Sequence, residues 1–96
     1  MAVQVVWTRR GERSFSEIIE SLARIDPEAA DRLQDSIIET TALLERHPYI
    51  GARYERVPLL REVLCDRYRI FYQVVKSRKI VAIHLVWHSS RDEPDF

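Results

Sequence analysis

Arginine and histidine side chains interrupt the apolar runs in the last third of this chain, and they are the residues best suited to chemistry. A strand that only builds a core has no use for a guanidinium group, which resists burial unless a partner neutralises it. Arginine binds phosphate or carboxylate through its fixed fork of donors, and histidine transfers protons near neutral pH. The pattern predicts either an anion-binding surface or internal ion pairs with Glu62 and Asp66. The residues concerned are Arg61, Arg67, Arg69, His84, His88 and Arg91.

Strand alternation predicts which of these side chains share a face of a sheet. The runs 68–75 and 80–88 each separate into an apolar set, which we expect to meet the core, and a mixed set that faces away. The apolar sets are Tyr68, Ile70, Tyr72 and Val74 in the first run, and Val81, Ile83, Leu85 and Trp87 in the second. On the face that no helix covers, we expect Arg69, Gln73, His84 and His88 to lie together. Guanidinium and imidazole groups on one surface would suit a metal-free ribonuclease.

Two helices are expected ahead of these strands. Apolar residues at helical spacing predict an amphipathic helix over 9–24, for which Thr8 is a candidate cap and Ser14 a second one. Asp26, followed by proline, is the signal for a second helix, which should continue to about Arg46. The buried positions expected on this second helix are Ala30, Leu33, Ile37, Ile38 and Leu44.

The order of elements predicts the fold class. A short β-type run at 3–7 precedes the helices, a loop is expected over 48–58, and three hairpin-connected strands follow from residue 59 onward. The short break between the helices predicts an antiparallel helical hairpin. We therefore expect a single α+β domain over residues 1–96, with β-α-α-β-β-β order and the hairpin packed on one face of an antiparallel sheet.

Charge and composition narrow the classes of function. The chain has 15 basic and 15 acidic residues, but residues 53–91 hold nine basic against three acidic side chains. This asymmetry predicts an anionic or acidic protein partner, or a solvated basic face. Cys65 is the only cysteine, so no internal disulfide can form and a cytoplasmic location is expected. The histidine spacing matches no zinc site and no apolar stretch reaches membrane length, so we expect no metal, no cofactor and no membrane contact.

These residues also resemble a known family, the RelE/ParE superfamily of toxins from bacterial type II toxin–antitoxin systems. The likeness covers nearly the whole chain, and it lies in the order and spacing of several motifs. They are Pro27-x-Ala29-Ala30-x-Arg32, Leu43-x-x-x-x-Pro48-x-x-Gly51, Leu60-Arg61-x-x-Leu64, Tyr68-Arg69-Ile70-x-Tyr72-x-Val74 and Ile83-x-x-Val86-x-His88-x-x-Arg91. The resemblance implies a growth-inhibiting toxin and a cognate antitoxin that covers its functional surface.

The family has two functional branches, and the resemblance implies different roles for the same residues in each. ParE-like members poison DNA gyrase, and the long helical hairpin and the His88-x-x-Arg91 ending look closest to them. In this branch the residues expected to contact the target or the antitoxin are Arg61, Arg67, Arg69, Trp87, His88 and Arg91.

RelE-like members cut messenger RNA on the ribosome, and that branch remains the alternative. There Arg69, His88 and Arg91 would be catalytic. RelE uses a tyrosine near its C-terminus, whereas this chain ends in Phe96, which cannot exchange a proton. The sequence therefore favours gyrase over the ribosome and messenger RNA as the target.

Overall fold

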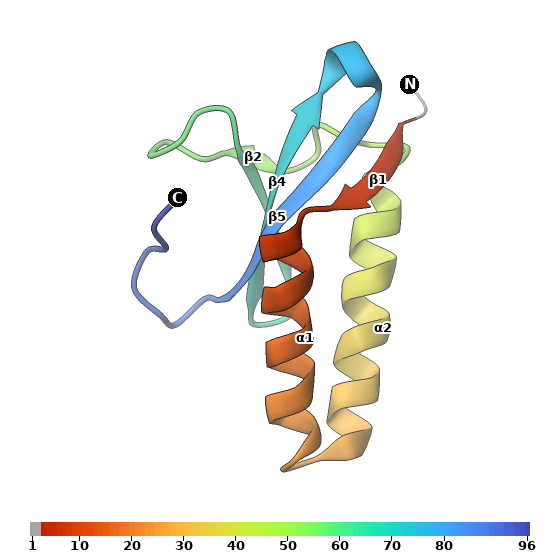
Figure 1. Ribbon diagram of the computed structural model, residues 1–96, viewed down its shortest axis with the longest axis vertical. Helices are drawn as coiled ribbons and strands as arrows, with labels where there is room; N and C mark the ends of the chain where they lie inside the picture. Colours follow the sequence, from red (N-terminus) through yellow and green to blue (C-terminus); the bar gives the residue numbers. More distant parts are fainter. Residues whose placement is uncertain (1–2) are drawn as a thin grey trace.

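A computed structural model describes residues 3–96 and contains two helices and a five-stranded sheet (Figure 1). The two helices form a hairpin on one face of the sheet, which confirms the α+β fold class and the order of the main elements. The elements are β1 (Gln4–Trp7), α1 (Arg9–Ala23), α2 (Pro27–Leu43), β2 (Ala52–Arg53), β3 (Arg61–Cys65), β4 (Tyr68–Val75), the 3₁₀ turn η1 (Lys76–Arg78) and β5 (Ile80–His88).

The sheet is mixed, whereas the sequence predicted an antiparallel one. Its strand order is β1-β5-β4-β3-β2, and β1 pairs with the first half of β5 in parallel. The hairpins β2–β3, β3–β4 and β4–β5 are antiparallel, as expected for short connections. β1 is separated from β5 by the rest of the chain, so no hairpin constrains its direction and the two strands can run the same way. The short strand β2 lies inside the segment that was predicted to be a loop.

Capping side chains account for where the helices begin. The Thr8 hydroxyl accepts a hydrogen bond from the Gly11 amide at 3.0 Å, and the Asp26 carboxylate accepts one from the Ala29 amide at 3.1 Å. Both predicted caps are confirmed. Ser14, the second candidate cap, instead lies within α1 and donates to the Gly11 carbonyl. α2 ends at Leu43, three residues before the predicted end.

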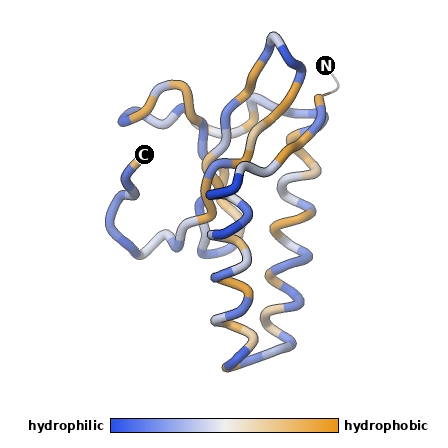
Figure 2. The backbone as a smooth tube through the Cα atoms, viewed as in Figure 1, coloured by the Kyte–Doolittle hydropathy of each residue, from blue (hydrophilic) through white to orange (hydrophobic). Residues whose placement is uncertain are grey.

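The main core lies between the helical hairpin and the sheet. Both helices alternate hydrophobic and hydrophilic segments along their length, as Figure 2 shows, so one side of each can be buried. Ile38 is 49 % exposed, so its predicted burial is wrong; its neighbour Ile37 takes the buried position. Completely buried residues of this core are Ile37, Leu44, Ile70, Tyr72, Val81 and Ile83.

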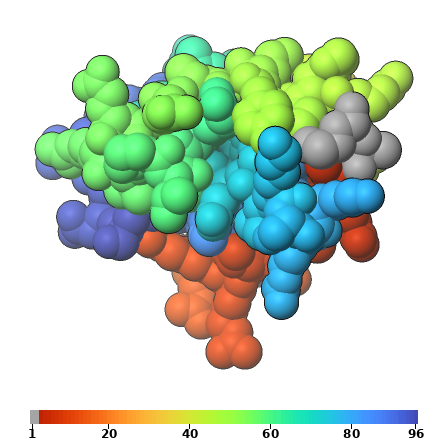
Figure 3. All heavy atoms as spheres, turned by 90° about the horizontal axis from the view of Figure 1, so that it is seen from above, coloured from red at the N-terminus to blue at the C-terminus, as the bar shows by residue number. Residues whose placement is uncertain are grey.

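A second, smaller core lies on the opposite face of the sheet, where the chain covers itself. Tyr54, Leu60, Phe71 and Leu85 form it, and Val57 and Trp87 pack at its edge. In Figure 3 the segment around residues 50–60 (green) lies beside the C-terminal residues (dark blue) on this side of the molecule. The face that was expected to be uncovered is therefore largely buried, and Phe71 at its centre has no exposed surface.

Candidate functional site

A bulge in β5 changes which side chains share a face. Phe71 pairs with Leu85, but the next residue of β4, Tyr72, pairs with Ile83, so His84 is an extra residue in β5. An extra residue reverses the alternation for everything after it. Leu85 and Trp87 therefore lie on the face of Phe71 and Arg69, opposite the helices.

The bulge separates the residues that were predicted to form one cluster. His88 pairs with Tyr68 in the sheet and lies on the helix side, where its ring meets the Tyr68 ring edge-to-face at 5.1 Å. Arg69, the next residue along β4, lies on the other side of the sheet. The predicted grouping of Arg69 with His88 is therefore wrong, because strict alternation does not hold across a bulge. Arg69 and His88 cannot act on one small substrate group from opposite faces.

Gln73 and His84 do meet, as predicted. The Gln73 side-chain oxygen lies 3.2 Å from His84 Nε2 and accepts a hydrogen bond in the tautomer that carries its proton on Nε2. Burial lowers the pKa of His84 below its usual value, and the nearby positive charge of Arg10 lowers it further. Both effects favour the neutral form of His84, which is a hydrogen-bonded residue of the sheet.

Arg69 is neutralised by two carboxylates within the chain. Its Nη2 and Nε donate to the two oxygens of Glu62 at 2.9 and 3.3 Å, and its Nη1 donates to Glu93 at 2.8 Å. The guanidinium also lies over the Phe71 ring, 4.8 Å from its centroid, and only 12 % of the side chain is exposed. The hydrogen bond with Glu62 is the main cause of the raised pKa of Arg69, and that with Arg69 is the main cause of the lowered pKa of Glu93.

The C-terminal residues 92–96, here called the tail, cover this face of the sheet. The Trp87 indole donates to the Asp92 carbonyl at 2.7 Å, Glu93 also accepts from the Tyr54 hydroxyl, and Pro94 is buried. Burial and the Glu93 carboxylate raise the pKa of Tyr54. Phe96 packs edge-on against Tyr54 and Phe71, with ring centroids 5.8 and 5.1 Å away. The tail thus supplies both an acidic group and an aromatic group to the surface around Arg69.

Two other candidate arginines lie elsewhere. Arg61 donates to the Gly51 carbonyl at 2.8 Å and stacks over the Tyr49 ring, so it supports the chain between α2 and β2. Arg67 is exposed in the β3–β4 turn, where its carbonyl accepts from the Ser89 amide. Within residues 3–96, neither forms an ion pair. Of the two internal ion-pair partners considered for the arginines, Glu62 is paired, with Arg69, and Asp66 is not.

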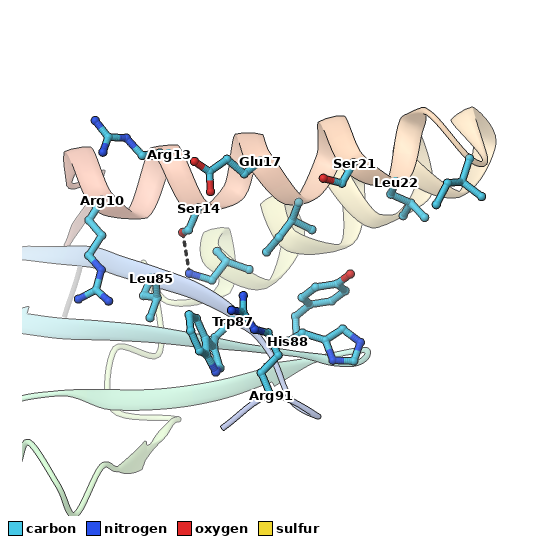
Figure 4. A pocket seen from close by; sticks show the side chains of 14 residues that line it. Arg10, Arg13, Ser14, Glu17, Ser21, Leu22, Leu85, Trp87, His88 and Arg91 are labelled. Atoms are coloured by element: carbon cyan, nitrogen blue, oxygen red, sulfur yellow. Dashed lines mark hydrogen bonds between the residues drawn. The ribbon is translucent and has the colours of Figure 1, made fainter. Parts of the chain in front are cut away.

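A groove between α1 and the second half of β5 collects the remaining candidates. Its volume is about 650 Å³, and Trp87, His88 and Arg91 line it together with residues of α1. In Figure 4, Arg10 extends from α1 toward β5, while Trp87, His88 and Arg91 gather near the end of that strand. The other lining residues are Arg13, Ser14, Glu17, Ile18, Ser21, Leu22, Ile25, Tyr68, Leu85 and Val86.

The groove carries positive charge that no carboxylate neutralises. In the described part of the chain, Arg10, Arg13 and Arg91 form no ion pair, and Glu17 is the one acidic side chain of the lining. Arg91 instead lies over the Trp87 ring at 4.3 Å, and the His88 Nδ1 interacts with the Ser90 amide and hydroxyl at 3.1 and 2.6 Å. The surface therefore combines cationic, aromatic and aliphatic groups.

Sequence reasoning missed the contribution of α1 to this site. Arg10 and Arg13 are one helical turn apart and so project from the same side of α1, but the sequence shows no sign that this side borders β5. Tyr68 was assigned to the core, yet it also lines the groove beside His88. Only the bulge, which turns His88 toward the helices, joins these residues into one site.

No metal site or membrane helix is found among residues 3–96. In that range there is no group of three or more His, Cys, Asp or Glu side chains that could hold a metal ion. Neither helix there is both long and apolar enough to cross a bilayer.

Comparison with known proteins identifies relatives of this fold. The family model described as the ParE toxin of the type II toxin–antitoxin system, parDE, matches residues 5–93. No curated protein matches the chain.

Several solved structures share the fold at low sequence identity. A chain of a chromosomal ParDE system from P. aeruginosa has a TM-score of 0.77 and 20 % identity, over 91 % of this chain and 96 % of that one. A RelBE toxin–antitoxin complex from Mycobacterium tuberculosis gives 0.67 and 19 %, over 92 % and 99 %. The isolated RelE toxin from E. coli gives 0.60 and 19 %, over 96 % and 89 %. At these identities the structural likeness concerns the fold.

Proposed function

The chain belongs to the ParE toxin family of type II toxin–antitoxin systems, and from this premise we propose that it inhibits growth by binding DNA gyrase. The proposed contact surface is the cationic groove between α1 and β5, which is lined by Arg10 of α1 and by Trp87, His88 and Arg91 at and just after the end of β5. In this function the chain is a binding protein, and it needs neither a metal nor a cofactor.

The observation that carries the proposal is the separation of Arg69 from His88. A ribonuclease of the RelE type would need the arginine and the acid–base group on one surface, within reach of one phosphate. Here the sheet lies between them, and Glu62 and Glu93 already satisfy the Arg69 guanidinium. Arg10 and Arg91 of the groove, by contrast, lie over the aromatic rings of Phe96 and Trp87 and have no carboxylate partner among residues 3–96. Their charge therefore suits an acidic protein surface.

We also propose a cognate antitoxin as the second partner. The neighbours from P. aeruginosa and M. tuberculosis were solved as toxin–antitoxin systems, and the groove here offers apolar side chains from α1 beside positive charge. An antitoxin segment with acidic and apolar residues would complement this surface. Occupancy of the groove would then block access of gyrase to Trp87, His88 and Arg91.

The test is induced expression with two readouts, followed by an assay on purified protein. We expect induction to stop growth and activate an SOS reporter, and the purified chain to inhibit supercoiling by gyrase. Arg91→Glu should abolish all three effects, because it reverses a charge in the groove. Arg32→Glu, an exposed change on α2 outside the groove, is the matched control and should retain them. Normal supercoiling with equimolar purified chain would refute the proposal.

The alternative is a ribosome-dependent ribonuclease, and one observation favours it. The groove brings His88 and Arg91 together with the Tyr68 hydroxyl, Arg10 and Arg13, which supplies an acid–base group and phosphate ligands without Arg69. Mapping of messenger RNA ends in the same induction separates the two functions. New cleavage ends that disappear in His88→Ala, with no SOS response, would favour the ribonuclease.

A further inference from the structure

The edge of β5 is only half covered by β1. The parallel pairing ends where Trp7 lies opposite Ile83, because the chain then turns into α1. The Thr8 amide still donates to the Ile83 carbonyl at 3.0 Å, and the Val86 amide donates to the Ser14 hydroxyl at 2.9 Å. α1 thus satisfies the first polar groups of the edge beyond β1, but it does not continue the ladder.

Two backbone groups remain beyond Ser14, and both face the groove. Backbone groups of successive residues in a strand point to its two edges in turn. The Ser89 amide points to the β4 edge, where it donates to Arg67, and the Val86 amide points to the open edge beside α1, where it donates to Ser14. The Val86 carbonyl and the His88 amide must therefore also point to the open side. Among the residues that the structure describes, neither has a hydrogen-bond partner. Unpaired strand edges of this kind are templates for an added strand.

The two free groups determine the direction of an added strand. In a parallel ladder, a residue bonds to the two neighbours of the residue that lies opposite it: its amide donates to the carbonyl of the preceding neighbour, and its carbonyl accepts from the amide of the following one. Gln4, for example, lies opposite Ile80 and donates to the carbonyl of Lys79. A residue opposite Trp87 would bond to Val86 and His88 in this way. A hydrogen-bonded antiparallel pair would need both the amide and the carbonyl of the same residue of β5 to be free. This is not so for Val86, whose amide donates to Ser14, or for His88, whose carbonyl accepts from Arg91.

The side chains around this position define the sequence that fits. A residue opposite Trp87 projects to the Trp87 side of the sheet, where Arg91 lies over the indole and Arg10 reaches past the edge, so an acidic side chain suits it. The residues before and after it project toward α1. There Ile18, Leu22 and Tyr68 line the groove, so apolar side chains suit both positions.

We propose that the groove binds an extended apolar–acidic–apolar segment as a sixth strand, parallel to β5, with its central residue bonded to Val86 and His88. We assign this segment to the antitoxin, and this assignment rests on the function proposed above. A second copy of this chain does not fit, because a two-fold pairing of identical edges is antiparallel. The positive charge of the groove favours an acidic segment from another protein.

The experiment uses the full chain and a short acetylated peptide with Val-Asp-Val at its centre, titrated by calorimetry. N-methylation of the central aspartate removes the amide that would donate to Val86, and we expect it to weaken binding by about tenfold or more. N-methylation of the valine that follows is the matched control, because its amide points away from β5, and it should change affinity by less than about twofold. The His88 amide should become protected from hydrogen exchange only when the peptide is bound.

The inference would be overturned by no binding of the unmodified peptide, by equal affinity of the two methylated peptides, or by binding without protection of the His88 amide. The last outcome would indicate a helical or side-chain-only occupant. Protection of that amide on concentrating the chain alone would instead indicate self-association at this edge, and would also overturn it. Failure of the gyrase assay with intact peptide binding refutes the proposed target alone, so the two failures are distinguishable.

Discussion

Arginines on the two sides of β5 illustrate two different uses of the same residue. Around Arg69, Glu62 and Glu93 complete an internal ion-pair network under aromatic side chains. Around Arg91, the indole of Trp87 supports the guanidinium, and no carboxylate within residues 3–96 pairs with it. The difference shows that burial and nearby acidic groups, rather than residue type, separate a structural arginine from one available to a partner.

The tail is the cause of much of this difference. It brings Glu93 and Phe96 onto the Arg69 face, while Asp92 holds the tail to Trp87 through its carbonyl. The edge of β5 beside α1 remains an open groove, although Phe96 of the tail lies against its Arg10, whose guanidinium is 5.1 Å from the ring centroid. The tail therefore closes the sheet face around Arg69 and leaves the edge of β5 beside α1 for binding.

The most disruptive change to this comparison is Gly11→Ala, which alters the wall of the groove. A Cβ at Gly11 would lie 2.2 Å from the Ile83 carbonyl oxygen, so α1 would have to move away from β5. We expect a loss of about 3 kcal/mol in the free energy of unfolding, from overpacking. Urea denaturation measures it, and Ser16→Ala on the exposed side of α1 should change it by less than about 0.5 kcal/mol. Equal stabilities of the two variants would contradict the close approach.

Arg69→Ala and Arg91→Ala test the comparison directly. Loss of Arg69 leaves Glu62 and Glu93 without their partner, and we expect it to cost about 2 kcal/mol, less than for a fully buried pair because Glu93 is substantially exposed. Arg91→Ala should change stability by less than about 0.5 kcal/mol.

Growth inhibition should show the reverse order once folded protein levels are matched. Arg91→Ala is expected to weaken toxicity more than Arg69→Ala, because only Arg91 lines the groove. The combined measurement is denaturation of each purified variant and growth after induction. A stable Arg69→Ala protein with no toxicity would reverse the assignment of the two arginines.

The smallest expected effect is pH-dependent docking of the tail. Arg69 lowers the pKa of Glu93 below its ordinary value of 4.5, so the folded state binds this proton less readily than the unfolded state. The ion pair of Glu93 with Arg69 therefore stabilises the docked tail above pH 4.5, and this stabilisation is lost as the pH falls through the lowered pKa of Glu93. The indole N–H signal of Trp87, bonded to Asp92, should report undocking by NMR. Glu93→Gln should remove this pH dependence of the Trp87 signal.

Much of the fold was predictable from local signals. Thr8 and Asp26 marked the two helix starts because capping depends on only a few neighbouring residues, and apolar periodicity identified Ile37 and Ile70 as core. The candidate site was predicted less well. His88 was assigned to the wrong face, and Arg10 was not recognised as part of the site, because neither follows from the periodicity of its own element.

The sequence by itself determined the fold class, the helical hairpin and the presence of arginine and histidine in the last strands, since these depend on short-range periodicity and composition. Only the tertiary structure decided which of them meet. The extra residue His84 reverses the alternation in β5, and contacts far apart in the chain bring Glu93 to Arg69 and α1 to His88. A bulge and a docked tail depend on long-range pairing free energies, which no local pattern of residue types contains.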